Sequence, residues 1–402
     1  MHGHLSNTPT TFQSDTGSVG MNSPFDQIKR KFRAKEVALE HLALIFVELP
    51  LKEVFHSSIG HRVSKQAIII KWVDKSGYVG YGECSCRPDP YYAAEFLTAV
   101  PLLIEQFIFP KLLPCSTYGD VQDVLDGIRG WPFAKAAIDF AIHDMLAAKE
   151  GMHLLEEWMS EKLHAIPAGI SISIYDDFVQ TEQAAETALQ KGFRRLKFKV
   201  TPKLDIQQFA KANFTKRATP LLFDANGSFR ATDFELLAQI AKLGVTIEQP
   251  FPPGRLDWCL AAKKQIPELK ICLDEDIKSI GTLSIAHSIG IIDELNLKPA
   301  RVGGIFPSLA IIDFCQNQQL NCWIGGMFET GIGRSLNLQF AGLLPTAKAH
   351  DISPSIRYFR EDLLVNNIKM QADGLIPVQE AFHSMDLTRL EKYTQKVIHL
   401  SK

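Results

Sequence analysis

The feature that most constrains the fold of this chain is a set of short apolar segments that recur about every 25 residues after residue 164. They are "IPAGISIS", "RRLKFKV", "PLLFDAN", "VTIEQPF", "LKICLDED", "DELNLKPA", "NCWIGGM" and "AHDISPS". The stretches between them, such as "ATDFELLAQIAKLG", have the spacing of amphipathic helices. Strands and helices that alternate in this way form parallel sheets, and about eight such units predict a closed α/β barrel of the (β/α)8 type. An open, doubly wound sheet is the alternative.

Residues 36–163 follow a different pattern and predict a separate α+β domain. "HLALIFVELP" and "QAIIIKWVDKSGYVGYGEC" have strand character, and the "DKSG" turn within the second is typical of a hairpin. Between them lies a polar connection, "LKEVFHSSIGHR". Helical patterns follow, and the strongest is "PFAKAAIDFAIHDMLAAKEG", in which Pro132 suits a helix start and Gly151 a helix end.

Composition narrows the class of protein and its partners. The chain has 402 residues, 46% hydrophobic and 22% charged, which is typical of a globular protein with two domains. A net charge of -2 gives no electrostatic footprint for nucleic acid, and no apolar run is long enough to span a membrane. Residues 1–35 are largely polar and lack the apolar segment of a secretory signal, so we expect a disordered N-terminal extension on a cytoplasmic protein.

The seven cysteines are an odd number, and most lie in apolar runs. This pattern predicts buried free thiols rather than disulfides. Cys84 and Cys86, in "CSC", are too close together for a usual zinc knuckle.

Charged residues stand where five successive strands are predicted to end. Asp224, Glu248, Asp274 and Lys298 follow one another at spacings of 24, 26 and 24 residues, and Lys199 precedes Asp224 by 25. A single acidic residue at a strand end usually caps a helix or forms a turn. Five such residues in register would all lie at the rim of the barrel where active sites are found, which indicates a catalytic centre.

Three carboxylates that converge in a barrel mouth would repel one another unless a cation lay between them. Asp224, Glu248 and Asp274 offer only hard oxygen ligands, which favour Mg²⁺, with Mn²⁺ as the alternative, and disfavour Zn²⁺. Asp276, two residues after Asp274, shares its face of the strand and is a rival third ligand. Asn226, in "DANG", either supports the site or is an ordinary turn residue.

The lysines of "RRLKFKV" suggest how such a site would act. Lys197 and Lys199 lie two residues apart in a strand, so they point to the same side. A metal makes the carbon next to a bound carboxylate acidic, and a neutral lysine can then remove its proton. Desolvation and the charge of Lys197 would lower the pKa of Lys199 from its usual ~10.4, so Lys197 would tune the base and Lys199 would act. Lys298 should face the substrate from the opposite side; a solvated strand face is the alternative explanation of the pair.

These residues resemble the enolase superfamily, and in particular its muconate-lactonising subgroup. The matching motifs are "KFK", "DAN", "EQP", "LDE" and "KP", at 197–199, 224–226, 248–250, 273–275 and 298–299. "GYGECSCRPDPYYAAE" and "AKAAIDFAIHDMLAAKEG" are similar to its capping-domain signatures, and "SPSIRYFREDLL" to its return from barrel to cap. The resemblance implies a (β/α)7β barrel over residues 164–355, and a capping domain formed by residues 36–163 with the C-terminal segment 356–402.

Within that subgroup, "LKPARVGG" and "GGMFETGIGR" look most like the o-succinylbenzoate synthases and the related N-succinylamino acid racemases. The resemblance implies Mg²⁺-dependent dehydration of 2-succinyl-6-hydroxy-2,4-cyclohexadiene-1-carboxylate through a metal-stabilised enediolate, a step towards menaquinone. Racemisation or another cycloisomerase or epimerase reaction is the alternative, and a non-catalytic binding scaffold is a third. The small-molecule carboxylate substrate would be selected by the loop around Ser58 and by Gly326 and Met327 in the last strands. The oligomeric state is left open, and a homo-oligomer fits as well as a monomer.

Overall fold

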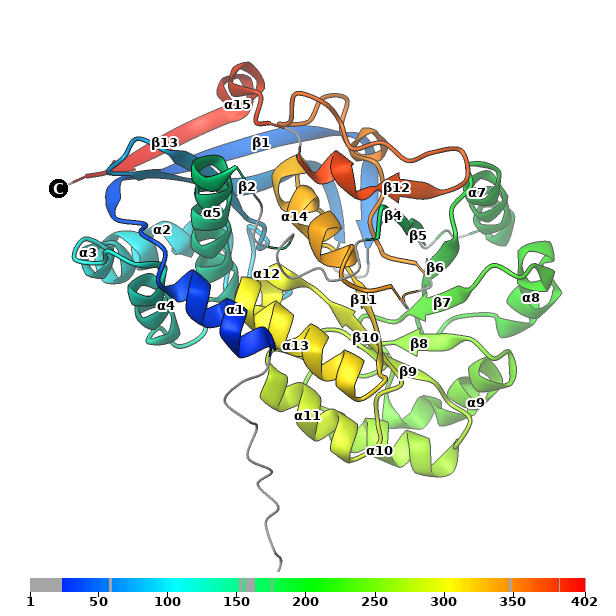
Figure 1. Cartoon of the computed structure of the whole chain (residues 1–402). Helices are drawn as coiled ribbons and strands as arrows, with labels where there is room; N and C mark the ends of the chain where they lie inside the picture. The colour runs from blue at the N-terminus through cyan, green and yellow to red at the C-terminus, as the bar shows by residue number, and fades with distance from the viewer. Residues whose placement is uncertain are drawn as a thin grey trace, which may run out of the picture.

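The computed structural model describes residues 24–57, 60–151, 155, 163–173, 175, 177–345, 347, 349–382 and 384–401. It contains an antiparallel sheet with most of its helices on one side and, beside it, a curled parallel sheet with helices around its outer face (Figure 1). None of the helices described is both long enough and apolar enough to cross a lipid bilayer.

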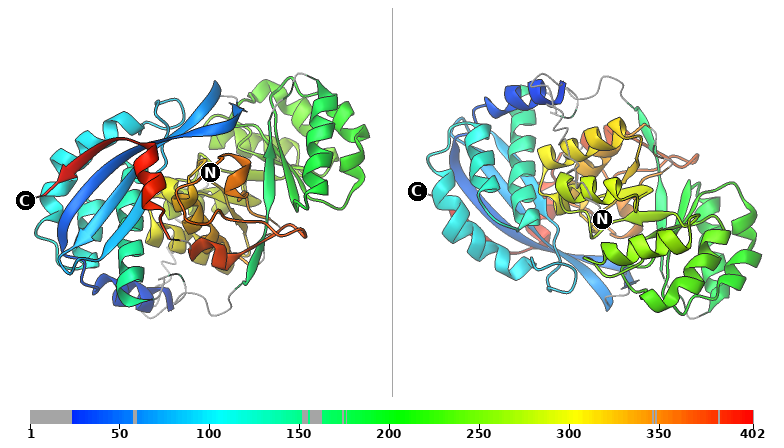
Figure 2. Two further views of the ribbon diagram at one scale, coloured as in Figure 1. Left: turned by 90° about the horizontal axis from the view of Figure 1, so that it is seen from above. Right: turned by 90° about the horizontal axis from the view of Figure 1, so that it is seen from below.

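The capping domain is built on a four-stranded antiparallel sheet of order β13-β1-β2-β3. Its strands are β1 (Leu39–Ser57), β2 (Gly60–Asp74), β3 (Val79–Cys84) and β13 (Thr394–Leu400). The hairpin predicted from "DKSG" is confirmed, because β2 and β3 pair antiparallel on either side of that turn. Figure 2 shows β13, in red, beside β1, in blue, so the first and the last strand of the described chain pair in one sheet.

Helices of this domain are α1 (Pro24–Arg33), α2 (Val100–Leu103), α3 (Phe109–Leu112), α4 (Tyr118–Asp126) and α5 (Pro132–Glu150), with a π-helical turn η2 (Ile104–Ile108) between α2 and α3. The predicted ends of α5 are confirmed: Pro132 is its first residue, and Gly151 ends it in the left-handed conformation. The helix lies against β3 at two glycines. A Cβ atom on Gly82 would stand 2.0 Å from the carbonyl oxygen of Ala137, so only glycine allows this approach.

The N-terminal helix α1 lies within the segment that we expected to be disordered, residues 1–35. Its apolar side chains Phe25, Ile28 and Phe32 are spaced three and four residues apart and pack against the main core. This burial outweighs the polar composition of the surrounding residues. Residues 1–23 lie outside the described residues.

The catalytic domain predicted from the repeated segments contains seven parallel strands in the order β11-β10-β9-β8-β7-β6-β5. They are β5 (Gly169–Ile172), β6 (Arg195–Lys199), β7 (Leu221–Asp224), β8 (Thr246–Glu248), β9 (Ile271–Leu273), β10 (Glu294–Leu297) and β11 (Asn321–Ile324). Its helices are α7 (Phe178–Gln190), α8 (Ile206–Lys211), α9 (Phe234–Lys242), α10 (Leu256–Gln265), α11 (Ile280–Ser288), α12 (Pro299–Val302), α13 (Ile305–Asn317) and α14 (Gly331–Ala341). The short strands β4 (Ala165–Pro167) and β12 (Leu375–Pro377) pair with each other, and α15 (Leu387–Tyr393) precedes β13.

The last apolar segment, "AHDISPS", does not form a regular strand. His350 makes a single parallel bridge with Ala168, and the backbone N–H of Asp351 donates to the carbonyl of Ile324 on β11. Residues 350 and 351 therefore lie between the first and last strands of the parallel sheet and bond to chain on both sides. The sheet is curled, and seven of the eight predicted strands are paired as strands.

Alternation along β6 decides which side chains face the inside of the curled sheet. The ring of Phe198 packs against Phe209 on α8 and against Phe214, on the helical side of the sheet. Lys197 and Lys199 must then point to the other side, because neighbouring residues of a strand face opposite ways. The like charges of this strand therefore lie inside the sheet, where they need partners.

Candidate active site

Strand register brings the predicted site residues to one level. Lys199 pairs with Asp224 across β6 and β7, and Asp224 pairs with Glu248 across β7 and β8. Asp274 and Lys298 are the residues that directly follow β9 and β10. All five therefore stand at the carboxyl ends of neighbouring parallel strands, as predicted, and four of them are less than a tenth exposed: Asp224, Glu248, Asp274 and Lys298.

Lys199 is held by two oxygen acceptors. Its ammonium donates to Asp224 Oδ2 at 2.7 Å and to Asn226 Oδ1 at 2.6 Å. Asn226 adopts a positive φ of 43°, a turn conformation that asparagine tolerates, and its side-chain amide donates to Glu275. Asn226 is thus both of the alternatives that the sequence left open, a turn residue and a support of the site.

Lys197 lies within reach of three carboxylates. Its ammonium is 2.8 Å from Asp351 Oδ2, 3.2 Å from Glu248 Oε2 and 3.3 Å from Asp224 Oδ2. Burial by itself lowers the pKa of this lysine, but the three carboxylates outweigh burial and raise its pKa above the usual range. The positive charge expected to tune Lys199 is therefore present, and it is compensated by its own ring of acids.

Lys298 and Arg301 hold the third carboxylate from the other side of the cluster. The ammonium of Lys298 donates to Asp274 Oδ2 at 2.8 Å, and the guanidinium of Arg301 donates to Asp274 Oδ1. The hydroxyl of Tyr92, from the capping domain, accepts from Lys298 at 3.2 Å. Burial lowers the pKa of Lys298, yet the neighbouring Tyr92 and Glu275 help to raise it above its usual value. Because β6 and β10 flank β7 to β9, Lys199 and Lys298 approach the carboxylates from opposite sides.

Asp276, the rival third ligand, makes hydrogen bonds to neighbouring loops. Its Oδ2 accepts from Gln249 Nε2 and its Oδ1 from the backbone of Gly254, each at 2.6 Å. Gln249 also accepts from the backbone of Asp274. Asp276 thus fastens the loop after β8 to the loop after β9, and the geometry favours Asp274 over Asp276 as the residue aimed at the cluster.

The carboxylate cluster suits a hard divalent cation by its chemistry. Asp224, Glu248 and Asp274 are nearly fully buried. No hydrogen-bond donor among the described residues is paired with Glu248 Oε2, although the ammonium of Lys197 lies 3.2 Å away. Buried oxygens of this kind are the ligands that Mg²⁺ takes in proteins. The oxygens of the three acids do not all lie within 4.8 Å of one another. Lysine ammonium groups pair with Asp224 and with Asp274. Asn296 fixes Glu248 by donating to its Oε1 at 2.7 Å.

Asp351 belongs to the site, and our sequence analysis did not single it out. It faces the same cavity as Lys197 and Lys199, and Ser171 donates to both of its oxygens at 3.2 and 3.1 Å. The signal was available, because Asp351 stands in the eighth apolar segment just as the other acids stand at the ends of theirs.

Comparison with known proteins places this arrangement in a family. The model of the family described as enolase C-terminal domain-like matches residues 180–382. An o-succinylbenzoate synthase from Enterococcus faecalis is 35% identical over 357 residues, which cover 87% of this chain and 96% of that protein. The chain belongs to the enolase superfamily. An N-succinylamino acid racemase from Thermus thermophilus is 30% identical over 85% of this chain and 92% of its own length.

Solved structures of the superfamily share the fold. One member, from Listeria innocua, has a TM-score of 0.84 and 32% identity, and the match covers 90% of this chain and 99% of that one. A muconate lactonizing enzyme from Pseudomonas fluorescens has a TM-score of 0.82 at 20% identity, which shows a common fold alone. Lysine bases that work beside Mg²⁺ are a known feature of enolase-superfamily sites.

The predicted substrate-binding residues are only partly described. Gly326 and Met327 line the cavity above Lys197, Lys199 and Asp224. The backbone N–H of Met327 donates to Glu329 Oε1 at 2.6 Å, and a Cβ atom on Gly326 would stand 2.7 Å from the other oxygen of that carboxylate. Because Gly326 has no side chain, the carboxylate of Glu329 can lie this close to the backbone of the loop. Ser58 lies outside the described residues.

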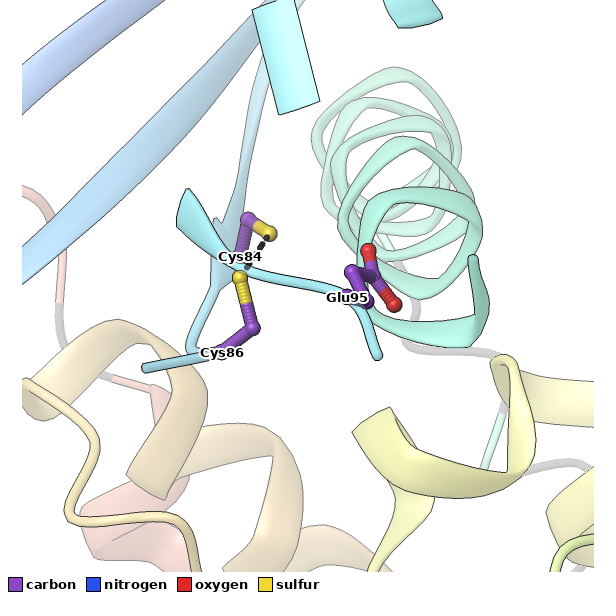
Figure 3. Close-up of side chains that lie close together, drawn as sticks. All are labelled: Cys84, Cys86 and Glu95. Carbon is purple, nitrogen blue, oxygen red and sulfur yellow. Dashed lines mark hydrogen bonds between the residues drawn. The ribbon is translucent and has the colours of Figure 1, made fainter. Parts of the chain in front are cut away.

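A second group of side chains that could ligate a metal lies outside this candidate site (Figure 3). The thiols of Cys84 and Cys86 are 3.6 Å apart, and the carboxylate of Glu95 lies beside them. Both oxygens of Glu95 already accept backbone N–H groups of Phe133 and Ala134 in the first turn of α5. Contact between the thiols and burial raise the pKa of Cys84. These residues are a helix cap and buried thiols, and the seven cysteines are all free and buried, as predicted.

Proposed function

We propose that the protein is an o-succinylbenzoate synthase, which removes water from 2-succinyl-6-hydroxy-2,4-cyclohexadiene-1-carboxylate in a step towards menaquinone. The observation that carries this proposal is the pair Lys199 and Lys298, which flank a buried carboxylate cluster from opposite sides. The chain's relatives support it, because proteins named o-succinylbenzoate synthase are 34 and 35% identical over most of its length. The fold alone would not carry the proposal, since one fold hosts many reactions.

The reaction requires that a proton and a hydroxyl group leave neighbouring carbons. Lys199, in its neutral form, takes the proton from the carbon that bears the ring carboxylate. The electrons of that C–H bond first delocalise onto the ring carboxylate, and they then form the new ring double bond as the C–O bond breaks. Lys199 returns the proton to the departing hydroxyl, which leaves as water. Lys298 stays protonated and stabilises the negative charge that develops on the carboxylate. Its raised pKa suits this role.

We propose Mg²⁺ as the cation of this site, held by Asp224, Glu248 and Asp274, with Mn²⁺ able to replace it. When bound, the ion supplies the positive charge that makes the hydrogen next to the substrate carboxylate acidic. The protein's part is to hold three buried carboxylates at the ends of adjacent strands, and to keep Glu248 oriented through Asn296.

We also infer that residues 349–352 take the place of an eighth strand and complete a (β/α)7β barrel. The bridge from His350 to Ala168 and the bond from Asp351 to Ile324 support this closure. The closure matters for function, because it carries Asp351 to the side of Lys197.

Racemisation of N-succinylamino acids is the second candidate. A Thermus thermophilus protein of that name is 30% identical over most of both chains. That reaction needs Lys199 and Lys298 to exchange roles as acid and base on the two faces of one carbon. The opposed placement of the two lysines permits it.

The test is a direct assay of both reactions with the purified protein and Mg²⁺. We expect o-succinylbenzoate to form from the cyclohexadiene substrate, and kcat/KM for dehydration to exceed that for racemisation of N-succinyl amino acids. Lys199→Ala is the control, and both activities should fall by about 10²–10⁴-fold in it. Racemisation without any dehydration would overturn the main proposal in favour of the second.

A further inference from the structure

The capping domain places two guanidinium groups over the active-site cavity. Arg62 comes from β2, and Arg87 follows shortly after β3. Two lysines that line this cavity, Lys197 and Lys199, are already engaged with carboxylates. The cavity is therefore lined both by reactive residues of the barrel and by cationic side chains of the cap.

Arg62 differs from the other cations in this cavity because, among the described residues, its side chain has neither an ion-pair partner nor a hydrogen-bond partner. Arg87 is paired with Asp89 through two bonds of 2.7 Å, and Arg334 donates to backbone carbonyls of Glu329 and Ser353. In the described part of the chain, no carboxylate lies within salt-bridge distance of Arg62, and no hydrogen-bond acceptor is paired with its side chain.

The surroundings of Arg62 penalise its positive charge. The residue is half-buried, and burial together with the nearby charge of Arg87 lowers the pKa of Arg62 to about 10, which still leaves it protonated at neutral pH. A desolvated cation beside a like charge is stabilised by an anion that reaches it. Asp89 attracts Arg62 only at longer range, since both of its oxygens are used by Arg87.

We infer that Arg62, with Arg87 beside it, binds the second carboxylate of a dicarboxylate substrate. This inference rests on the proposed function, because the succinyl group of that substrate carries a carboxylate remote from the reacting carbons. The ring carboxylate must lie near Lys199, so the succinyl tail extends towards the cap. The remote carboxylate then gives the guanidinium of Arg62 a charge-assisted hydrogen bond for which the described residues supply no acceptor.

Two probes isolate this contact without requiring turnover. One is o-succinylbenzoate, and the other is 2-butanoylbenzoate, which has a methyl group in place of the remote carboxylate. Their dissociation constants can be measured calorimetrically with Mg²⁺ for the unmodified protein, for Arg62→Gln and for Arg62→Lys. Arg129→Gln is the matched control, since Arg129 is exposed and does not line the cavity.

We expect the unmodified protein to bind o-succinylbenzoate about 10- to 100-fold more tightly than 2-butanoylbenzoate, the range for a hydrogen bond to a charged group. Arg62→Gln should weaken the binding of o-succinylbenzoate by that factor and leave the affinity for 2-butanoylbenzoate unchanged. Arg62→Lys should keep part of the preference for o-succinylbenzoate. In turnover assays Arg62→Gln should raise KM and change kcat little, as for a contact made equally in the ground and transition states.

The outcomes separate the two proposals. Equal affinity for both probes in an enzyme that still forms o-succinylbenzoate would overturn the role of Arg62 and leave the proposed function standing. A preference that persists in Arg62→Gln would likewise assign the carboxylate to another residue. If neither probe binds and the protein does not dehydrate the cyclohexadiene substrate, both the proposed function and this inference are overturned.

Discussion

Replacing Asp351 by asparagine should destabilise the fold by removing the acid closest to a buried cation. Asp351 Oδ2 lies 2.8 Å from the ammonium of Lys197, and the side chain of Lys197 is only 4% exposed. Asparagine has nearly the same shape as aspartate, so the change removes a charge and leaves the packing intact.

The expected magnitude follows from what Lys197 retains. Removal of one partner from a buried ion pair costs about 3–5 kcal/mol when the other charge is left alone. Lys197 keeps Glu248 at 3.2 Å and Asp224 at 3.3 Å, so the loss is partial. We therefore expect the free energy of unfolding to fall by about 2–3 kcal/mol at pH 7.

The pH dependence of this loss has a definite sign. Burial raises the pKa of Asp351, but Lys197 and Arg195 outweigh burial and hold its pKa well below the usual range. A carboxylate with a depressed pKa contributes stability above its unfolded-state pKa of ~3.9, and that contribution is lost as pH falls through the folded-state pKa. Lys197, whose pKa is raised, stays charged throughout this range. The stability difference should therefore be constant from about pH 5 to pH 8 and narrow at more acidic pH.

Urea unfolding of the metal-free protein at pH 7 and pH 3 provides the measurement. The indole of Trp323 lies 5.2 Å from the ammonium of Lys197, so tryptophan fluorescence reports on this part of the sheet. Asp257→Asn is the control, because Asp257 is exposed and paired with Arg255 at the surface, and its midpoint should not move. The reasoning would be refuted if Asp351→Asn were as stable as the unmodified protein at pH 7. It would also be refuted if the two proteins differed in free energy of unfolding by the same amount at pH 3 as at pH 7.

Three further predictions concern the chemistry. Lys199→Ala should lose about 10²–10⁴-fold in kcat and show no exchange of the substrate's α-hydrogen with D₂O by NMR, and surviving exchange would assign the base elsewhere. Lys298→Arg should retain part of the dehydratase activity, because a fixed cation suffices there, yet lose any racemase activity; equal loss of both would count against a purely electrostatic role. EDTA should abolish activity and Mg²⁺ restore it. By calorimetry, Asp224→Asn should lose Mg²⁺ binding while Asp276→Asn keeps it, since Asp276 is occupied by Gln249 and Gly254; the reverse pattern would exchange the two roles.

Much of the catalytic domain could be predicted from the sequence, because its parallel strands obey simple periodic rules. A repeat near 25 residues sets one strand and one helix per unit, and parallel register puts the end of every strand at the same rim. The sequence pattern alone therefore places Lys199, Asp224 and Glu248 side by side, and the strand register confirms this.

Local rules were also sufficient for the turn of β2 and β3 and for the ends of α5. Proline at the start and glycine at the end of that helix act through their own backbone geometry, which no distant residue needs to supply. The same rules wrongly predicted disorder for residues 24–33, which form α1. The spacing of Phe25, Ile28 and Phe32 has meaning only once a core lies beneath it.

Only the tertiary structure decided how the charges are shared. Lys197 and Lys199 look alike in "RRLKFKV", yet one meets three carboxylates and the other meets Asp224 and Asn226. Arg62 reaches the same cavity from a strand of the other domain, more than a hundred residues earlier in the chain. Periodicity predicts which side of a strand a residue faces, whereas the partner it meets there depends on how separate segments pack, and the packing sets burial, charge compensation and pKa.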